Sequence, residues 1–135
     1  MADNWNDSII AEFRANGGKV GGPFEGHTLL LLHTTGAKSG QTRINPVMAF
    51  ELDGKLLIVG SYAGSDHDPA WLHNLRADPN AHIEIGTESY DVQACELPRA
   101  ERDAAYDRIV ERAPGFGEYQ AKTSRVIPVI ELRRR

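Results

Sequence analysis

A loop of small residues with two cations follows the most apolar run of the chain. The run "TLLLL" leads into "HTTGAKSGQTR", residues 33–43. Gly36 and Gly40 allow backbone conformations in which amide groups converge, and Lys38 and Arg43 add positive charge. An arginine can hold a phosphate through two parallel hydrogen bonds, but the spacing does not match the phosphate-binding loop G-x-x-x-x-G-K-[ST]. The residues therefore indicate an anion site of another kind, with a glycine-rich hairpin carrying solvated cations as the alternative.

The segment "GSYAGSDHDPAW", residues 60–71, has a similar composition. It follows an apolar run and leads into an expected helix, whose N-terminus attracts negative charge. Asp68 is predicted as the N-cap and Pro69 as the first helical residue. Trp71 could stack on a planar ring, although a tryptophan in a helix more often belongs to the core. Two loops of this kind in one small domain favour an anionic ligand.

Other common chemistries find little support in the sequence. The five histidines form no H-E-x-x-H motif and no close ligand pair, so no metal site is expected. No G-x-S-x-G elbow occurs, which disfavours a serine hydrolase. The one cysteine, Cys95, excludes an internal disulfide and a multi-cysteine metal site.

Length and composition are those of a single globular domain, residues 1–135. The chain is 41% hydrophobic and 25% charged, with a net charge of -4. This acidic balance disfavours a nucleic-acid partner. The N-terminus lacks the pattern of a secretory signal, and the apolar runs are too short to span a bilayer. We therefore expect a cytoplasmic protein without stable membrane insertion, either a monomer or a homodimer.

Hydrophobic periodicity and turn residues predict the elements that must position these loops. Asp53-Gly54 indicates a tight hairpin turn, and Pro46 indicates an edge or a bulge within its strand. The expected strands are 28–34, 43–52, 55–61, 81–86, 89–97 and 126–132. The expected helices are about 5–15, 68–78 and 98–113, and 114–125 is a loop or a short helix. Mostly antiparallel strands with short connections predict a small β-barrel with flanking helices, a mainly β, α+β fold.

Three segments resemble the deazaflavin-dependent nitroreductase family. They are "PFEGHTLLLLHTTGAKSGQTRINPV", "VGSYAGSDHDPAWLHNLRADP" and "PGFGEYQAKTSRVIPVIEL". The resemblance covers about residues 5–132, and the combination of the three motifs is more specific than any one of them. It implies a split β-barrel of the FMN-binding-like type and coenzyme F420 as the cofactor, with FMN less expected.

The resemblance also implies a set of cofactor-binding residues. The phosphate-bearing side of the deazaflavin would be held by Lys38, Ser39, Gly40 and Arg43. The ring pocket would be lined by Asn45, Pro46 and Met48. Backbone contacts to the ring or its side chain would come from Ser61, Tyr62, Ala63 and Gly64, and the site would be closed by Trp71 and Asn74. His67 stands where family members often carry a basic residue, so it would contribute when protonated.

The activity implied by the resemblance is hydride transfer from reduced F420 to an electron-poor acceptor such as a quinone, an enone or a nitroaromatic. Such an acceptor gains negative charge, which a nearby donor would stabilise. Tyr119 is the predicted donor, and Ser61 is the reserve. The alternatives are a non-catalytic F420-binding or carrier protein and an FMN-binding or haem-degrading split barrel.

Overall fold

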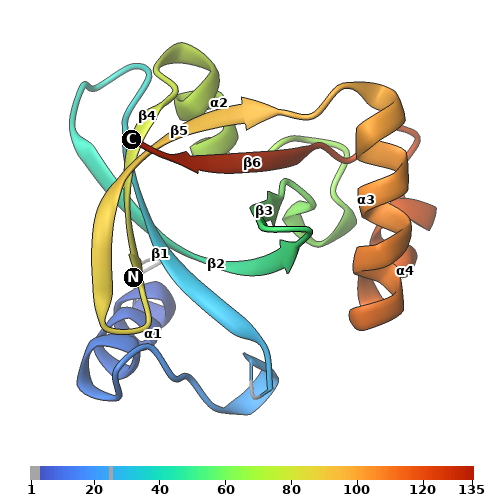
Figure 1. Ribbon diagram of the computed structural model, residues 1–135. Coiled ribbons are helices and arrows are strands. Elements are labelled where there is room, and N and C mark those ends of the chain that lie inside the picture. Colours follow the sequence, from blue (N-terminus) through green and yellow to red (C-terminus); the bar gives the residue numbers. More distant parts are fainter. Residues whose placement is uncertain (1–3, 25) are drawn as a thin grey trace.

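The computed structural model describes residues 4–24 and 26–135, without the side chains of Asn4, Trp5, Pro23 and Ala63. Within this part of the chain, six strands close into a barrel in the order β1-β2-β3-β6-β5-β4 (Figure 1). The strands are β1 (Thr28–Thr35), β2 (Thr42–Leu52), β3 (Lys55–Val59), β4 (Asn80–Ile85), β5 (Glu88–Glu96) and β6 (Val129–Arg134). All neighbouring strands are antiparallel. The predicted barrel is confirmed.

The continuous leucine run of β1 is explained by burial on both faces of the strand. Leu30 and Leu32 point into the barrel, whereas Leu29 and Leu31 pack outside it against Phe13. A strand covered on both faces loses the alternation of apolar and polar residues that a half-exposed strand shows.

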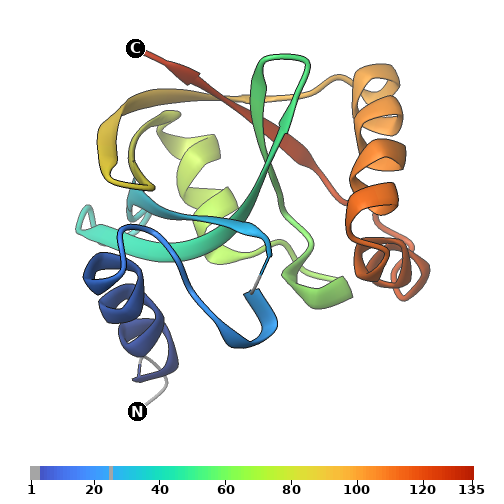
Figure 2. The same cartoon turned by 60° about the horizontal axis from the view of Figure 1, so that its bottom comes forward.

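Four helices and two short 3₁₀ turns cover the described barrel. The helices are α1 (Asn4–Ala15), α2 (Ala70–Ala77), α3 (Arg99–Arg112) and α4 (Gly115–Ala121), and the turns are η1 (Gly22–Phe24) and η2 (Tyr62–Gly64). Helix α1 lies on one side of the barrel, and α3 and α4 lie on the opposite side (Figures 1 and 2). None of these helices is long and apolar enough to cross a membrane.

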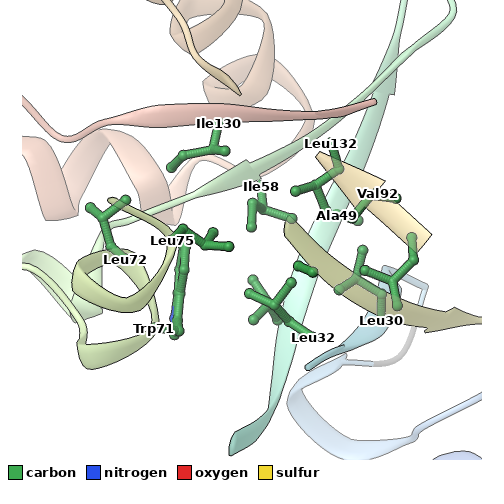
Figure 3. Packing of buried hydrophobic residues seen from close by; sticks show 13 residues of the cluster. Leu30, Leu32, Ala49, Ile58, Trp71, Leu72, Leu75, Val92, Ile130 and Leu132 are labelled. Atoms are coloured by element: carbon green, nitrogen blue, oxygen red, sulfur yellow. The ribbon is translucent and has the colours of Figure 1, made fainter. Parts of the chain in front are cut away.

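Helix α2 packs against the barrel interior. Its residues Trp71, Leu72 and Leu75 join the buried cluster that contains Ile58 and Ile130 (Figure 3). The helix begins one residue later than Pro69, which occupies the N-cap position. The predicted capping role of Asp68 is wrong, because no side chain caps this helix and the Asp68 carboxylate instead pairs with two arginines.

The second strand has a free edge where the sequence predicted one. β2 pairs with β1 along Thr42–Ala49, but it pairs with β3 only from Ala49 to Leu52. Among the described strands, the segment 42–48 therefore has a neighbour on one side only. Pro46 lies in this segment, where a residue without an N–H is tolerated. The hairpin turn is also confirmed, since Asp53 and Gly54 both have positive φ.

Candidate functional site

Two cavities lie side by side along the free edge of β2 and the start of α2. The larger one, of about 860 Å³, is lined by Asn45 and Ala70, and the smaller one, of about 480 Å³, by Pro46 and Trp71. Because consecutive residues line different cavities, the two hollows adjoin. The larger one is called the cationic cavity here, and its other lining residues include Asp7, Arg14, Lys38, Ser39, Arg43, His73 and Asn74. The smaller one is called the aromatic cavity, and its other lining residues include His27, Met48, Ser61, Tyr62, Arg112, Phe116 and Tyr119.

The cationic cavity carries two positive charges that are not consumed by ion pairs. Lys38 and Arg43 are exposed, and within the described residues neither side chain forms an ion pair or a hydrogen bond. A free guanidinium and a free ammonium beside one hollow favour an anion such as a phosphate or a carboxylate. The charges predicted from the sequence to bind an anion therefore do line one cavity.

The loop that carries these charges is fixed by its own backbone. The amides of Gly36, Gly40 and Gln41 bond within the loop, to Gln41 O, Gly36 O and Ser39 Oγ. The Ala37 amide donates to Asn74 Oδ1 at 2.9 Å. The expectation that the loop amides converge on a ligand is wrong for these four groups, because each already has a partner inside the protein.

Asn74 connects the loop to the barrel. Its side chain is buried, and besides receiving the Ala37 amide it donates to Thr34 Oγ1 at 3.1 Å. A buried amide with two internal hydrogen bonds holds neighbouring segments in one arrangement. Asn74 lines the cationic cavity while it binds the loop, so it positions the chain segment that presents Lys38.

Helix α1 forms the far wall of the cationic cavity and is tied to the barrel by a carboxylate. Glu84 accepts hydrogen bonds from Arg14 at 2.7 and 3.1 Å and contacts His33 Nε2 at 2.7 Å. The hydrogen bond from Arg14, followed by the contact with His33, lowers the pKa of Glu84 to about 2. Arg14 is therefore a paired charge, unlike Lys38 and Arg43.

The aromatic cavity is built on core residues. Trp71 is only 8% exposed and belongs to the barrel core, yet it also lines this cavity. The core interpretation of this residue is confirmed, and stacking on a planar ring stays a prediction. Phe116 also lines this cavity, and it packs edge-to-face against Phe50 and against Tyr119, with ring centroids 5.5 and 5.4 Å apart. Aromatic pairs at this distance form a rigid apolar wall.

Two tyrosines beside this wall differ in what their hydroxyls do. Tyr106 donates to Phe116 O at 2.6 Å and is buried, and this burial raises the pKa of its phenol. The Tyr119 hydroxyl has no hydrogen-bond partner among the described residues, and its ring lines the cavity. Tyr119 is thus the one of the two that is free to bond a ligand.

Arg125 holds turn η2 in place through its backbone carbonyl groups. This guanidinium donates to the carbonyl oxygens of Ser61 and Ser65 at 2.8 Å, and its Nη1 lies 2.8 Å from Asp68. Ser61 is buried and lines the aromatic cavity, whereas Tyr62 is exposed at the same cavity. The turn therefore presents two consecutive residues to the hollow from a fixed backbone.

Comparison with known proteins identifies the family of this chain. Residues 6–133 match the family of the F420H2-dependent quinone reductases. The chain belongs to this family. An F420H2-dependent quinone reductase of Mycobacterium tuberculosis (strain H37Rv) is 38% identical over 132 residues, covering 93% of this chain and 87% of that protein. The resemblance to deazaflavin-dependent reductases is confirmed.

Two solved structures share the fold of this family member. An F420-H2 dependent reductase has a TM-score of 0.70 and 39% identity, covering 78% of this chain and 93% of that one. A structure described as a domain-swapped dimer has a TM-score of 0.72 and 32% identity, covering 98% of this chain and 100% of that one.

Most of the site residues predicted from the sequence line one of the two cavities, but one of them lies in a different cavity from the one expected. Asn45 lies in the cationic cavity and not with Pro46 and Met48 in the aromatic one. Three of the predicted site residues that the structure describes in full line neither cavity: Gly40, Gly64 and His67. The side chain of Ala63 lies outside the described part of the structure. Gly64 serves packing instead, because a Cβ at this position would lie 2.9 Å from Tyr119 O. His67 is exposed, and its amide bonds Ser65 Oγ.

Several lining residues gave no signal in the sequence. Arg14 and Arg112 are the last-turn cations of α1 and α3, where a basic residue commonly complements the helix dipole. His27 lies in a loop before β1 and lines the aromatic cavity. Only the tertiary arrangement shows that these three residues face a cavity, since their sequence neighbourhoods have ordinary structural explanations.

Proposed function

We propose that this protein uses reduced coenzyme F420 to reduce quinones. Family membership supports this function, and one observation carries it: two unpaired cations line a cavity that adjoins an aromatic one. An elongated cofactor with an anionic tail and a planar ring requires such a pair of neighbouring environments.

The residues present fit this cofactor. Lys38, Ser39 and Arg43 would hold the phosphate of the tail, since their donors line the cationic cavity and are not consumed by ion pairs. Pro46, Met48 and Trp71 would contact the ring from the floor of the aromatic cavity. When bound, the reduced deazaflavin supplies a hydride, and the protein need not contribute a nucleophile.

The remaining task of the protein is to receive the acceptor and manage its charge. A quinone that accepts a hydride also needs one proton to become a hydroquinone. The Tyr119 Oη–H is the group we assign to donate to the acceptor oxygen, because its hydroxyl is free of internal partners and its ring lines the cavity. Solvent can restore this proton through the open mouth of the cavity. Ser61, buried at the same cavity, is the second candidate donor.

Exclusion of water is the other contribution of these side chains. Phe116 and Trp71 supply apolar walls on two sides of the aromatic cavity. A partly dry site strengthens the hydrogen bond to the developing oxygen anion, since the local dielectric falls.

The test is a fluorescence titration with F420, with FMN in parallel, followed by oxidation of reduced F420 with benzoquinone and naphthoquinone. We expect F420 to bind, FMN to bind weakly, and quinone to be reduced. F420 binding without reduction of quinones, enones or nitroaromatics would instead identify a carrier. FMN binding in place of F420 would overturn the cofactor assignment.

A further inference from the structure

Tyr62 is a large aromatic side chain that the protein leaves in solvent at the edge of the aromatic cavity. It is 59% exposed, and among the described residues only Val126 is another exposed large hydrophobic side chain. No hydrogen bond or ring contact engages the Tyr62 side chain within the described part of the chain. Its ring therefore contributes little to the stability of the fold.

The backbone at this position is unfavourable for a tyrosine. Tyr62 has φ of 46°, in the left-handed region that bulky residues rarely adopt. Asp53 is the other described non-glycine residue with positive φ, and it lies in a hairpin turn that favours this conformation. At Tyr62 a glycine or an asparagine would adopt the same backbone with less strain.

The surroundings impose this conformation on the turn. Tyr62 O accepts the Ser65 amide at 3.0 Å, and the Gly64 amide donates to Ser61 O at 2.9 Å. Arg125 also donates to Ser61 O, and Gly64 fits closely against the backbone of Tyr119. A strained residue persists only where its neighbours determine the backbone in this way. The direction of the Tyr62 Cα–Cβ bond is therefore fixed by the fold.

This exposed aromatic ring on a strained backbone has no ring contact among the residues that the structure describes, so a planar ligand is the partner that can provide one. Tyr62 lines the cavity that also contains Tyr119, and its side chain there is more exposed to solvent than buried. A quinone is planar and electron-poor, which suits stacking on the electron-rich face of a phenol ring. In the proposed function, the cofactor ring would instead contact the buried Trp71.

We propose that the Tyr62 side chain is the stacking surface for the quinone ring and determines which acceptors are used. This role rests on the proposed function, an F420-dependent reduction of quinones. A fused two-ring quinone covers more of the phenol face than a one-ring quinone does. The protein should therefore prefer naphthoquinones over benzoquinones, and the preference should depend on the ring of Tyr62.

The experiment compares four variants of the full chain: Tyr62→Gly, Tyr62→Asn, Tyr62→Phe and Asp53→Gly. The glycine and asparagine variants keep the left-handed backbone without a ring, and the phenylalanine variant keeps the ring without a hydroxyl. Asp53→Gly is the control for the backbone change, because it introduces glycine at the other positive-φ position, in a turn that lines neither cavity. It also removes the exposed ion pair between Asp53 and Arg108, which lies outside both cavities. The measurements are F420 affinity, melting temperature, and KM and kcat for both quinones.

We expect Tyr62→Gly and Tyr62→Asn to raise KM for naphthoquinone about tenfold and KM for benzoquinone less. Tyr62→Phe should keep the wild-type values, and Asp53→Gly should leave both KM values unchanged. F420 affinity should stay within about twofold in all four variants, because the cofactor contact that the family resemblance implies for Tyr62 comes from its backbone and not from its side chain. The melting temperature of Tyr62→Gly should not fall, because the ring is not part of the core.

Three results would overturn this role. Equal KM values in wild type and Tyr62→Gly would remove the acceptor contact. A loss of F420 affinity as large as the rise in KM would assign the ring to the cofactor, and a lower melting temperature with normal KM would make it structural. The wild-type protein is tested first. If it binds no F420 or reduces no quinone, the proposed function is overturned together with the role of Tyr62.

Discussion

The two adjoining cavities obtain their chemistry in opposite ways. In the cationic cavity, internal hydrogen bonds fix the loop backbone and Asn74, while the charged ends of Lys38 and Arg43 remain without partners. In the aromatic cavity, the wall itself belongs to the hydrophobic core, as Trp71 and Phe116 show. Substitutions of the free cations should therefore change ligand binding without changing stability, whereas substitutions of the core residues in the aromatic wall should change both.

The largest test of this difference is Trp71→Ala. Removing a buried tryptophan should cost about 3–5 kcal/mol of unfolding free energy, measured by urea denaturation, and should also weaken F420 binding. Leu72→Ala is the matched control, since Leu72 packs in the same core but lines neither cavity. It should destabilise by about 2–5 kcal/mol and leave the F420 affinity of the folded protein unchanged. Full affinity in folded Trp71→Ala would separate this residue from the ligand.

The cationic cavity should show the opposite behaviour. Replacing both Lys38 and Arg43 by alanine should weaken F420 binding by at least about 100-fold, because each charged hydrogen bond contributes about 1.5–3 kcal/mol. Stability should change by less than about 0.5 kcal/mol, since neither side chain has a partner in the described protein. The control is Lys19→Ala with Lys55→Ala, which removes the same charge outside both cavities. A similar loss of affinity in this control would indicate a general electrostatic effect.

The difference between the cavities also explains what the sequence could predict. Lys38 and Arg43 were identifiable because small flexible residues surround them and no apolar pattern accounts for them. The leucine run of β1 predicted a buried strand correctly, because a strand that is buried on both faces is apolar at consecutive positions. By contrast, Arg112 reaches the aromatic cavity only because α3 ends beside it, where it donates to Glu51 O. Contacts between elements distant in sequence leave no local pattern.

The same limit explains the wrong predictions. Asp68 has the residue type and position of an N-cap, but Arg76 and Arg125 offer its carboxylate stronger charged partners. The loop amides were expected to face a ligand, yet the turn satisfies them with its own carbonyls and with Asn74. A buried or constrained polar group takes the partner that the fold brings to it, and the sequence alone does not identify that partner.

Tyr119, which lines the aromatic cavity, and Tyr106, which is buried beside its aromatic wall, offer a smaller and sharper comparison. Tyr119→Phe should lower quinone turnover by at least about tenfold while F420 affinity and stability stay nearly constant, because only a free hydroxyl is lost. Tyr106→Phe should do the reverse. It removes the hydrogen bond to Phe116 O and should cost about 1 kcal/mol of stability without a change in turnover of the folded protein. Equal turnover in wild type and Tyr119→Phe would exclude the proton-donor role.

The smallest expected effect concerns the carboxylate that ties α1 to the barrel. The pKa of Glu84 is lowered to about 2 in the folded protein, below its usual value of 4.5, chiefly by the hydrogen bond from Arg14. A lowered pKa contributes stability above pH 4.5, and this contribution is lost as the pH falls from 4.5 towards 2. We expect a loss of about 1 kcal/mol over this range, because Arg14 is half exposed and water screens the pair.

Glu84→Gln tests this contribution and its link to the cationic cavity. The free energy of unfolding should change less between pH 4.5 and 2 in this variant than in the wild type. Urea denaturation at each pH measures it. Glu88→Gln, at the exposed start of β5, is the control and should retain the wild-type dependence. Because Arg14 lines the cationic cavity, losing its partner should leave a third unpaired cation there and should not weaken F420 binding at neutral pH. Weaker binding in Glu84→Gln would mean that the position of α1, rather than the free charge of Lys38 and Arg43, determines the affinity of that cavity.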